Sequence, residues 1–223
     1  MTPARPTLPR RAAAEGLAAF ALVFAGCGAA ITDARYANAL GTVGVALVFG
    51  LVIMVMVYAT GHLSGAHINP AVTLAFTLTR HFPARDAIAY VVAQLAGATT
   101  AALLLLAMWT DKPAELGATL PTVGAGTALV YEVVLTAFLM FVIMAVATDT
   151  RAVGAAAAIA IGATVGLDAL FGGPVTGASM NPARSFGPAL ASGEWHMFWV
   201  YVAGPLTGAS IGALAYQAVR GDS

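Results

Sequence analysis

Charged side chains are scarce in this sequence. Lysine and arginine together number 10, aspartate and glutamate also number 10, and charged residues make up 9% of the 223 residues, where a soluble domain carries roughly 25%. Hydrophobic residues make up 60%, and the mean hydropathy is +0.86. Such a chain cannot cover its own surface with polar groups. The sequence therefore predicts a membrane protein whose solvent is mostly lipid.

Cysteine is nearly absent as well, since Cys27 is the only one. A single cysteine excludes an internal disulfide framework and a thiolate metal site, and its apolar neighbours favour a small packing residue. The formal net charge is zero and the sequence holds no basic patch, which leaves nucleic-acid binding without support. We expect no metal, no cofactor and no nucleic-acid partner.

Long apolar segments are what the chain does contain. Each is near the roughly 20 residues that a helix needs to cross a bilayer. All must be helical, because hydrocarbon offers no partner to unpaired backbone groups. The first lacks a clear cleavage site, so we expect it to be a retained span rather than a signal peptide. The six segments are 12–31, 42–60, 88–109, 127–147, 152–171 and 195–216.

Two short segments, half a chain length apart, repeat one pattern. Residues 64–71 read SGAHINPA and residues 176–183 read TGASMNPA, so Gly, Ala, Asn, Pro and Ala fall in register. Each segment lies between strongly apolar stretches. A duplicated motif at matching places of two hydrophobic halves indicates a site built from inverted repeats.

Each motif begins a segment that is too short to be a span. Residues 69–79 and 181–190 have room for roughly 15 Å of helix at 1.5 Å per residue, about half of a hydrocarbon core near 30 Å. Two half-helices that enter from opposite faces would meet near the midplane. Their non-helical lead-ins, 62–68 and 171–180, are tolerated only where they are buried in protein or line water.

The repeat extends beyond the motifs. Residues 90–98 match residues 201–209 at Tyr, Val, Leu, Gly and Ala. Glu15 near the start of the first span matches Glu132 near the start of the fourth. Small residues at every fourth position also let the last span approach another helix closely; these are Gly204, Gly208 and Gly212.

These matches predict one transmembrane domain over residues 1–223, with repeat 1 at about 12–109 and repeat 2 at about 127–217. Three spans per repeat is an odd number, so the second repeat must have the opposite topology. The predicted fold class is an all-α membrane protein with six transmembrane helices and two re-entrant half-helices in an inverted repeat.

Basic residues in the flanks predict the orientation, because Lys and Arg accumulate on the cytoplasmic side. With the amino terminus inside, the outer side holds Arg35 and Lys112, whereas the inner side holds more, namely Arg5, Arg10, Arg11, Arg80, Arg85, Arg151 and Arg220. We expect a multi-pass protein of the cell inner (plasma) membrane with both termini in the cytoplasm.

The residues of the two motifs suit the start of a helix. An Asn side-chain oxygen at the N-cap accepts from a free backbone N–H of the first turn, and a Pro at the next position has no N–H to leave unpaired. Capping with the oxygen would leave the side-chain NH₂ to donate into a pore. Two helix N-termini would also place partial positive charge at one point, which opposes cations. The motif residues are Asn69, Pro70, Ala71, Asn181, Pro182 and Ala183.

Arg184 follows Asn181 by three residues, one turn into the second half-helix. A guanidinium inside a membrane costs roughly 2.5–3.5 kcal/mol or more, unless it lines water and bonds to nearby carbonyls. The alternative is a side chain that extends to the membrane surface. Its place beside the motif favours a pore, where its five donors could replace water around a solute.

Four other ionisable residues are expected to support the structure. Glu15 and Glu132 could form a proton relay, but their repeat relation favours carboxylates that accept from backbone N–H groups of the irregular lead-ins. His62 and His67 precede the first motif and could be metal ligands; bracing of the loop or a pH-sensitive role at the pore mouth is favoured. Asp168, near the end of the fifth span, has no assigned role beyond buried hydrogen bonding.

These residues resemble the aquaporin superfamily, also called the major intrinsic proteins, over nearly the whole chain. The segments GHLSGAHINPAVT at 61–73 and GASMNPARSFGP at 177–188 carry the resemblance. The wording GGPVTGASM at 172–180 is nearest to the plant nodulin-like (NIP) subgroup and its bacterial relatives. The resemblance implies six tilted spans, two half-helices, one pore per protomer and a homotetramer.

The resemblance also implies a selectivity filter on the outer side of the pore. Distances from the two motifs place it at Phe49, Ala169, Ala178 and Arg184. Water-specific members typically have His where this chain has Ala169, so we expect a wider and less polar constriction. Glycerol facilitators usually follow the arginine with Asp, and this chain has Ser185 there.

We therefore expect a passive channel for water and small uncharged polar solutes, such as glycerol-like polyols and metalloid hydroxides of the arsenous or boric acid type. Its expected partners are these solutes, membrane lipid and further copies of the chain in a homotetramer. The alternative from another class is a proton-coupled secondary transporter that uses Glu15 and Glu132. An enzyme is not expected, because no nucleophile and base are paired in the motifs.

Overall fold

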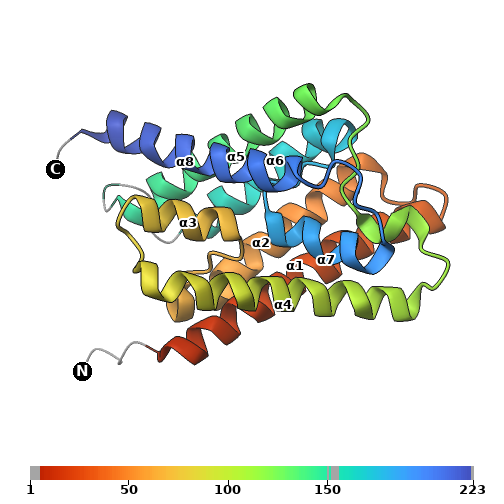
Figure 1. The fold of residues 1–223 in the computed structure, drawn as a ribbon, viewed down its shortest axis with the longest axis horizontal. Helices are drawn as coiled ribbons and strands as arrows, with labels where there is room; N and C mark the ends of the chain where they lie inside the picture. The colour runs from red at the N-terminus through yellow and green to blue at the C-terminus, as the bar shows by residue number, and fades with distance from the viewer. Residues whose placement is uncertain (1–5, 150, 152–155, 222–223) are drawn as a thin grey trace.

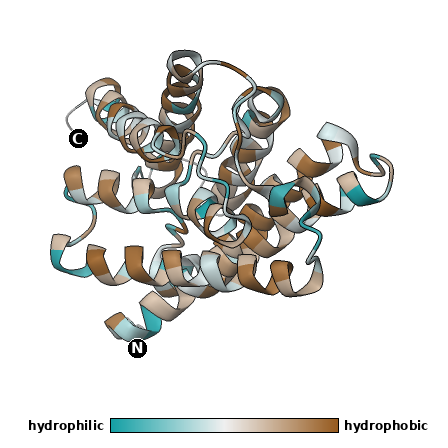
Figure 2. Ribbon diagram, turned by 45° about the vertical axis from the view of Figure 1, so that its right-hand side comes forward, coloured by the Kyte–Doolittle hydropathy of each residue, from teal (hydrophilic) through white to brown (hydrophobic). Residues whose placement is uncertain are grey.

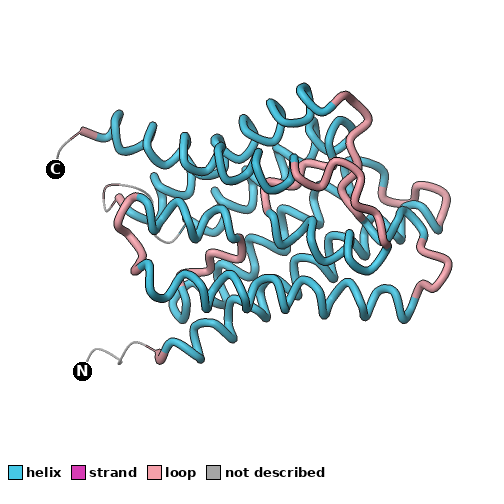
Figure 3. The backbone as a smooth tube through the Cα atoms, in the orientation of Figure 1, coloured by secondary structure: helices cyan, strands magenta, loops and turns pink. Residues whose placement is uncertain are grey.

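The computed structural model describes residues 6–149, 151 and 156–221, and within these the chain is helical with no strand. Figure 3 shows that loops gather at the two ends of the bundle, apart from two short stretches in its middle. The helices in chain order are α1 (Leu8–Arg35), α2 (Gly41–Ser64), α3 (Pro70–Leu78), α4 (Ala84–Met108), the short 3-10 helix η1 (Pro113–Gly117), α5 (Ala125–Thr148), α6 (Ala157–Thr176), α7 (Pro182–Ser192) and α8 (Val200–Arg220).

Six of these helices are long and two, α3 and α7, are half as long, as the sequence predicts. Five of the long helices among the described residues have the length and apolar composition to cross a membrane: α1, α2, α4, α5 and α6. The sixth, α8, is not among these five and packs along α5. Large apolar side chains cover the outside of the bundle, for example Ile88 and Leu17, which are 74% and 67% exposed. Figure 2, a ribbon coloured by hydropathy, shows hydrophobic residues along the long helices.

The two half-helices occupy opposite halves of the molecule (Figure 1): α3 lies toward the end that holds both termini, and α7 lies toward the other end. The basic residues of the predicted inner set sit on segments at the end with the termini, namely the start of α1, the α3–α4 connection and the ends of α5 and α8. Arg5 of that set, and 152–155 of the predicted fifth span, lie outside the described residues.

Glycines make the repeated helix pairs possible. The α1–α4 pair of repeat 1 corresponds to the α5–α8 pair of repeat 2. A Cβ added at Gly97 would collide with the carbonyl oxygen of Gly16, and one added at Gly208 would collide with that of Val133. Gly212 meets α5 in the same way. The predicted close approach of the last span is therefore confirmed, and its partner is α5.

The lead-ins to the half-helices are shorter than predicted. The α2 helix continues to Ser64 and α6 to Thr176, so the irregular stretches begin only at Gly65 and Gly177. Both glycines take left-handed backbone angles, with φ of 97° and 86°, which glycine adopts without the steric cost of a Cβ. Each helix thus ends where the left-handed glycine that follows it turns the chain, not where the apolar run weakens.

Candidate pore and selectivity filter

Asn69 and Asn181 cap the two half-helices. The Asn69 side-chain oxygen accepts from the backbone N–H of Ala71 at 2.8 Å. The Asn181 oxygen accepts from Ala183 at 3.0 Å and from Arg184 at 3.3 Å. Both asparagines have extended backbone angles and a proline follows each. This local geometry is what the two motifs predict, because the cap and its partners lie within one turn of each other.

Each asparagine also reaches across to the other repeat. The Asn69 amide nitrogen donates to the carbonyl of Met180 at 2.7 Å, and the Asn181 amide nitrogen donates to the carbonyl of Ile68 at 3.0 Å. The expectation that the whole NH₂ group is free is therefore wrong. An amide carries two N–H groups. One N–H of each asparagine donates to the opposite loop, and the other remains for the cavity that both side chains line.

Glu15 holds the first loop. Its two carboxylate oxygens accept from the backbone N–H groups of His67 and Ile68 at 2.9 and 2.6 Å. They also accept from the Ser64 hydroxyl at 2.7 Å and from the Gln94 amide at 2.8 Å. The carboxylate is fully buried, so these donors replace the water that an ionised group would otherwise need.

Glu132 holds the second loop in the same way. It accepts from the backbone N–H groups of Ser179 and Met180, both at 2.9 Å, and from the hydroxyl of Thr176 at 2.8 Å. Its partners occupy the same places in the second repeat as those of Glu15 in the first. The buried carboxylates therefore fix the two irregular stretches that would otherwise leave backbone donors unpaired in the membrane.

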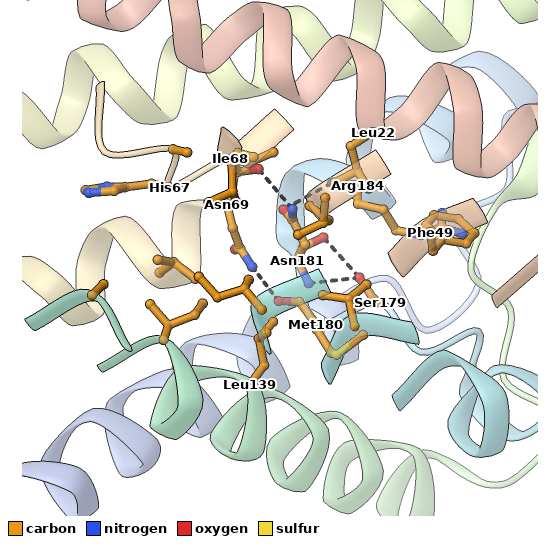
Figure 4. Close-up of a pocket in the computed structure, with 18 of the residues that line it drawn as sticks. Leu22, Phe49, His67, Ile68, Asn69, Leu139, Ser179, Met180, Asn181 and Arg184 are labelled. Atoms are coloured by element: carbon orange, nitrogen blue, oxygen red, sulfur yellow. Dashed lines mark hydrogen bonds between the residues drawn. The ribbon is translucent and has the colours of Figure 1, made fainter. Parts of the chain in front are cut away.

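A narrow cavity runs past the two capped helix ends. Figure 4 shows the Asn69 and Asn181 side chains pointing toward its middle, with His67 toward one end and Phe49 at the other. Its walls are mostly apolar and include Leu22, Ile53, Val72, Leu139, Ile143 and Val165. The cavity has a volume of about 60 Å³. A water molecule needs at least about 10–15 Å³, so there is room for a short file of waters.

A second, wider hollow of about 400 Å³ opens at the end away from the termini. It lies between the end of α1, the start of α2, η1 and the end of α6. The two hollows share four lining residues, Phe49, Ala169, Ala178 and Arg184. These are the four residues that the family resemblance assigns to the filter. They come from four separate parts of the chain and stand at the boundary between the hollows.

Arg184 is held from three sides. Its Nη1 donates to the carbonyl of Gly117 at 2.8 Å and to the Cys27 sulfur at 3.6 Å. Its guanidinium lies over the Phe49 ring, 4.8 Å from the ring centre. The side chain is 6% exposed and extends toward Phe49 at the boundary of the hollows (Figure 4). A guanidinium has five N–H donors, so Arg184 keeps further N–H groups for a molecule in the hollows beside it.

The two histidines differ. His67 lines the narrow cavity, packs against Phe82 and Phe76 with ring centres 4.7 and 4.9 Å away, and lies 3.1 Å through Nδ1 from the Thr73 hydroxyl. His62 does not support the loop as predicted, since it is exposed on α2. The reason is the longer helix, which keeps His62 in regular structure rather than in the lead-in.

Several supporting residues carry no role in the sequence prediction. The Tyr90 hydroxyl donates to the Ser64 carbonyl at 2.7 Å, and the Tyr201 hydroxyl donates to the Thr176 carbonyl at 2.6 Å. Each tyrosine thereby closes the last turn of the helix before a loop. The signal was present, because both tyrosines begin the second pair of repeated segments. Gln94 has no equivalent in the other repeat, and no sequence signal marked it.

Asp168 is fully buried, and neither carboxylate oxygen has a hydrogen-bond partner among the described residues. The expectation of buried hydrogen bonding is therefore not met. The residue lies on α6 immediately before Ala169, but it does not line either hollow.

Comparison with known proteins agrees with this geometry. The family model for "Major intrinsic protein" matches residues 4–216. The chain is 53% identical over 207 residues to aquaporin NIP1-1 of Zea mays, covering 93% of this chain and 73% of that protein. It is 48% identical to nodulin-26 of Glycine max, covering 93% and 76%.

The fold has a close counterpart among solved structures. The aquaglyceroporin from Plasmodium falciparum superimposes with a TM-score of 0.84 at 24% identity, covering 94% of this chain and 96% of that one. At this identity the likeness shows the fold. The family match, the identity to nodulin-like aquaporins and the two capped half-helices together show that this chain is a multi-pass membrane protein of the major intrinsic protein family.

Proposed function

We propose that the protein is a passive channel for water and small uncharged polar solutes. The observation that carries this function is the narrow cavity lined by the Asn69 and Asn181 side chains between apolar walls. Each amide gives one N–H to the opposite loop, and its second N–H is the donor that we assign to a passing solute. A neutral solute that sheds water on entry finds donors at this one level. No moving part is required, since each loop is already fixed by a carboxylate, a tyrosine and an asparagine.

Four residues form the filter in this proposal. Phe49 and Arg184 supply an apolar wall and a fixed donor, and Ala169 and Ala178 leave the opposite side small. Such a constriction suits a solute with hydroxyls along one side, which can bind Arg184, and carbon along the other, which can contact Phe49. Glycerol-like polyols are solutes of this kind. Uncharged metalloid hydroxides have similar size and donors. The identity to proteins named aquaporin NIP1-1 and nodulin-26 supports a channel of this family.

Cations are excluded by fixed positive charge in this proposal. Both half-helices direct their N-termini at the Asn level, and each terminus carries roughly half an elementary charge. Arg184 adds a full charge at the filter. Protons are rejected for the same reason, since a hydronium ion would have to pass both places.

The proton-coupled transporter is not favoured. It needs Glu15 and Glu132 to exchange protons with the pore, but neither residue lines the cavity and both are committed to loop donors. Their relation to one another by the repeat matches a shared structural task. The family members to which the chain is similar are aquaporins by name, which also favours a channel over an enzyme.

Assembly and placement complete the proposal. We infer a single domain that forms a homotetramer with one pore per protomer, in the cell inner (plasma) membrane with both termini in the cytoplasm. The termini lie at one end of the bundle (Figure 1), together with most of the basic residues, and Lys and Arg accumulate on the cytoplasmic side.

Purified protein in liposomes tests the function. Stopped-flow light scattering would compare water, glycerol, urea, boric acid and arsenous acid uptake with that of empty liposomes, with and without a pH gradient. We expect faster water and glycerol equilibration that ignores the gradient. Accumulation of a solute against its own gradient would establish the transporter, and rates equal to those of empty liposomes would reject the channel.

A further inference from the structure

The Phe49 ring of the filter rests directly on Gly26 of α1. A Cβ built on Gly26 would lie 2.5 Å from both Cδ1 and Cζ of the Phe49 ring, and closer still to Cε1. Real Cβ atoms essentially never approach a heavy atom within 3.0 Å. The ring can therefore occupy its observed position only because residue 26 has no side chain.

The open space beside the Phe49 ring lies on the side of the two hollows, which the ring lines. Its helix, α2, cannot retreat, because a Cβ on Gly50 would lie 2.7 Å from the Gly162 carbonyl of α6 and the backbones are already in contact there. On its free side the ring borders both hollows and the guanidinium of Arg184, 4.8 Å from the ring centre. A side chain at residue 26 would thus push the ring into the aperture.

The next residue of α1 touches the other half of the filter. The fully buried Cys27 sulfur accepts from Nη1 of Arg184 and its S–H donates to the Gly117 carbonyl, each at 3.6 Å. The same carbonyl accepts from Arg184 at 2.8 Å. A Cβ built on Gly117 would lie 2.7 Å from the Cβ of Cys27. The α1 and η1 helices are therefore in close contact next to the Arg184 guanidinium.

We propose that Gly26 and Cys27 are positioning residues for the filter. Gly26 fixes the place of the Phe49 ring and thereby the width of the constriction, and Cys27 fixes the position of the Arg184 guanidinium. Neither residue lines the narrow cavity. The inference deepens the proposed function and rests on it, because it assumes that solute passes between Phe49 and Arg184.

Gly26→Ala tests the width. An extra methylene in a close-fitting site changes selection by roughly tenfold or more, so we expect glycerol permeability to fall by at least about tenfold and water permeability to fall much less. Gly28→Ala is the matched control on the same helix, since a Cβ there meets only Leu105 Cδ2 at 3.9 Å. It should leave both permeabilities unchanged.

A second variant separates a shifted ring from a damaged protein. Phe49→Ala removes the ring atoms that Gly26→Ala would meet, so Gly26→Ala in the Phe49→Ala background should conduct glycerol as Phe49→Ala alone does. If Gly26→Ala by itself fails to fold, recovery of folded protein in the double variant supports the same contact. Equal glycerol permeability in wild type and Gly26→Ala, or a double variant as impaired as Gly26→Ala, would overturn the inference.

Cys27 is tested by charge exclusion, which a packing role would not alter. Cys27→Ala removes one partner of Arg184 and should raise proton leak, by less than Arg184→Val does, whereas Cys27→Ser retains a donor and acceptor and should restore exclusion. Leak in Cys27→Ala equal to that of wild type would contradict this half of the inference. Failure of the channel itself is recognised separately, because wild-type liposomes would then match empty ones.

Discussion

The carboxylate of Glu132 offers the sharpest test of how the pore is held open. It accepts three hydrogen bonds from the second loop, from Ser179 N, Met180 N and the Thr176 hydroxyl, and it is fully buried. Each buried donor left unpaired costs roughly 1–3 kcal/mol. Glu132→Leu leaves the two backbone N–H groups unpaired, whereas the Thr176 hydroxyl still has the Gly172 carbonyl at 3.5 Å. The expected loss is about 2–6 kcal/mol, a large part of the stability of a domain.

Glu132→Gln should cost less, because its single oxygen still serves the donors on one side. Its amide would then face the N–H of Met180, so one hydrogen bond is lost, for about 1–3 kcal/mol. The expected order of unfolding free energy is wild type, then Gln, then Leu. Water permeability should fall in the same order, since the loop it releases carries the Asn181 cap.

Denaturant titration of the protein in micelles, followed by helical circular dichroism, measures this order. Glu115→Gln is the control, because Glu115 is an exposed acidic residue on η1. The reasoning is refuted if Glu132→Leu is no less stable than Glu132→Gln, or if both match the control while retaining wild-type water permeability.

Three further predictions concern the filter and the end of α5. Ala169→His should depress glycerol flux more than water flux in stopped-flow light scattering, because an imidazole would narrow a boundary now lined by a methyl group; equal loss of both would contradict it. Arg184→Val should increase proton and cation leak across liposomes, since the fixed charge of the filter is gone; unchanged leak would argue against that role. The pKa of Asp149 lies below its usual range, first because the Arg151 side chain donates hydrogen bonds to its carboxylate and next because the Arg151 backbone N–H does so. The stability from this contact is therefore present at neutral pH and is lost as the pH falls through that lowered pKa. Arg151→Gln should move the pKa of Asp149 back up toward the ordinary range in a carboxyl NMR titration, and an unmoved titration would show that another group controls it.

The half-helices are the part of the fold that local sequence decides. The cap oxygen of Asn69, its partner Ala71 and the proline between them lie within three residues, so their geometry needs no distant contact. The ends of the preceding helices are also local, because Gly65 and Gly177 turn the chain. The apolar runs alone placed these ends several residues early, because each helix continues for a few less apolar residues after its run, to Ser64 and to Thr176.

Other features depend on residues that are far apart in the chain. The Glu15 and Glu132 carboxylates reach loops 52 and 47 residues away, and only their repeat relation hinted at a common task. Gln94 beside Glu15, the exposure of His62 and the absence of a hydrogen-bond partner for Asp168 among the described residues had no such hint. Each follows from which helix faces are turned inward, and that is fixed by packing rather than by the segment itself.

By itself the sequence determined a membrane protein of two inverted halves with two capped half-helices, because hydropathy, Asn-Pro capping and repetition act over a few residues or over composition. Only the tertiary structure decided that the two asparagines also fasten each other's loops, that four dispersed residues form one constriction, and that Gly26 and Cys27 stand behind it. Contacts between separate helices depend on how close their backbones come, and no single segment encodes that distance.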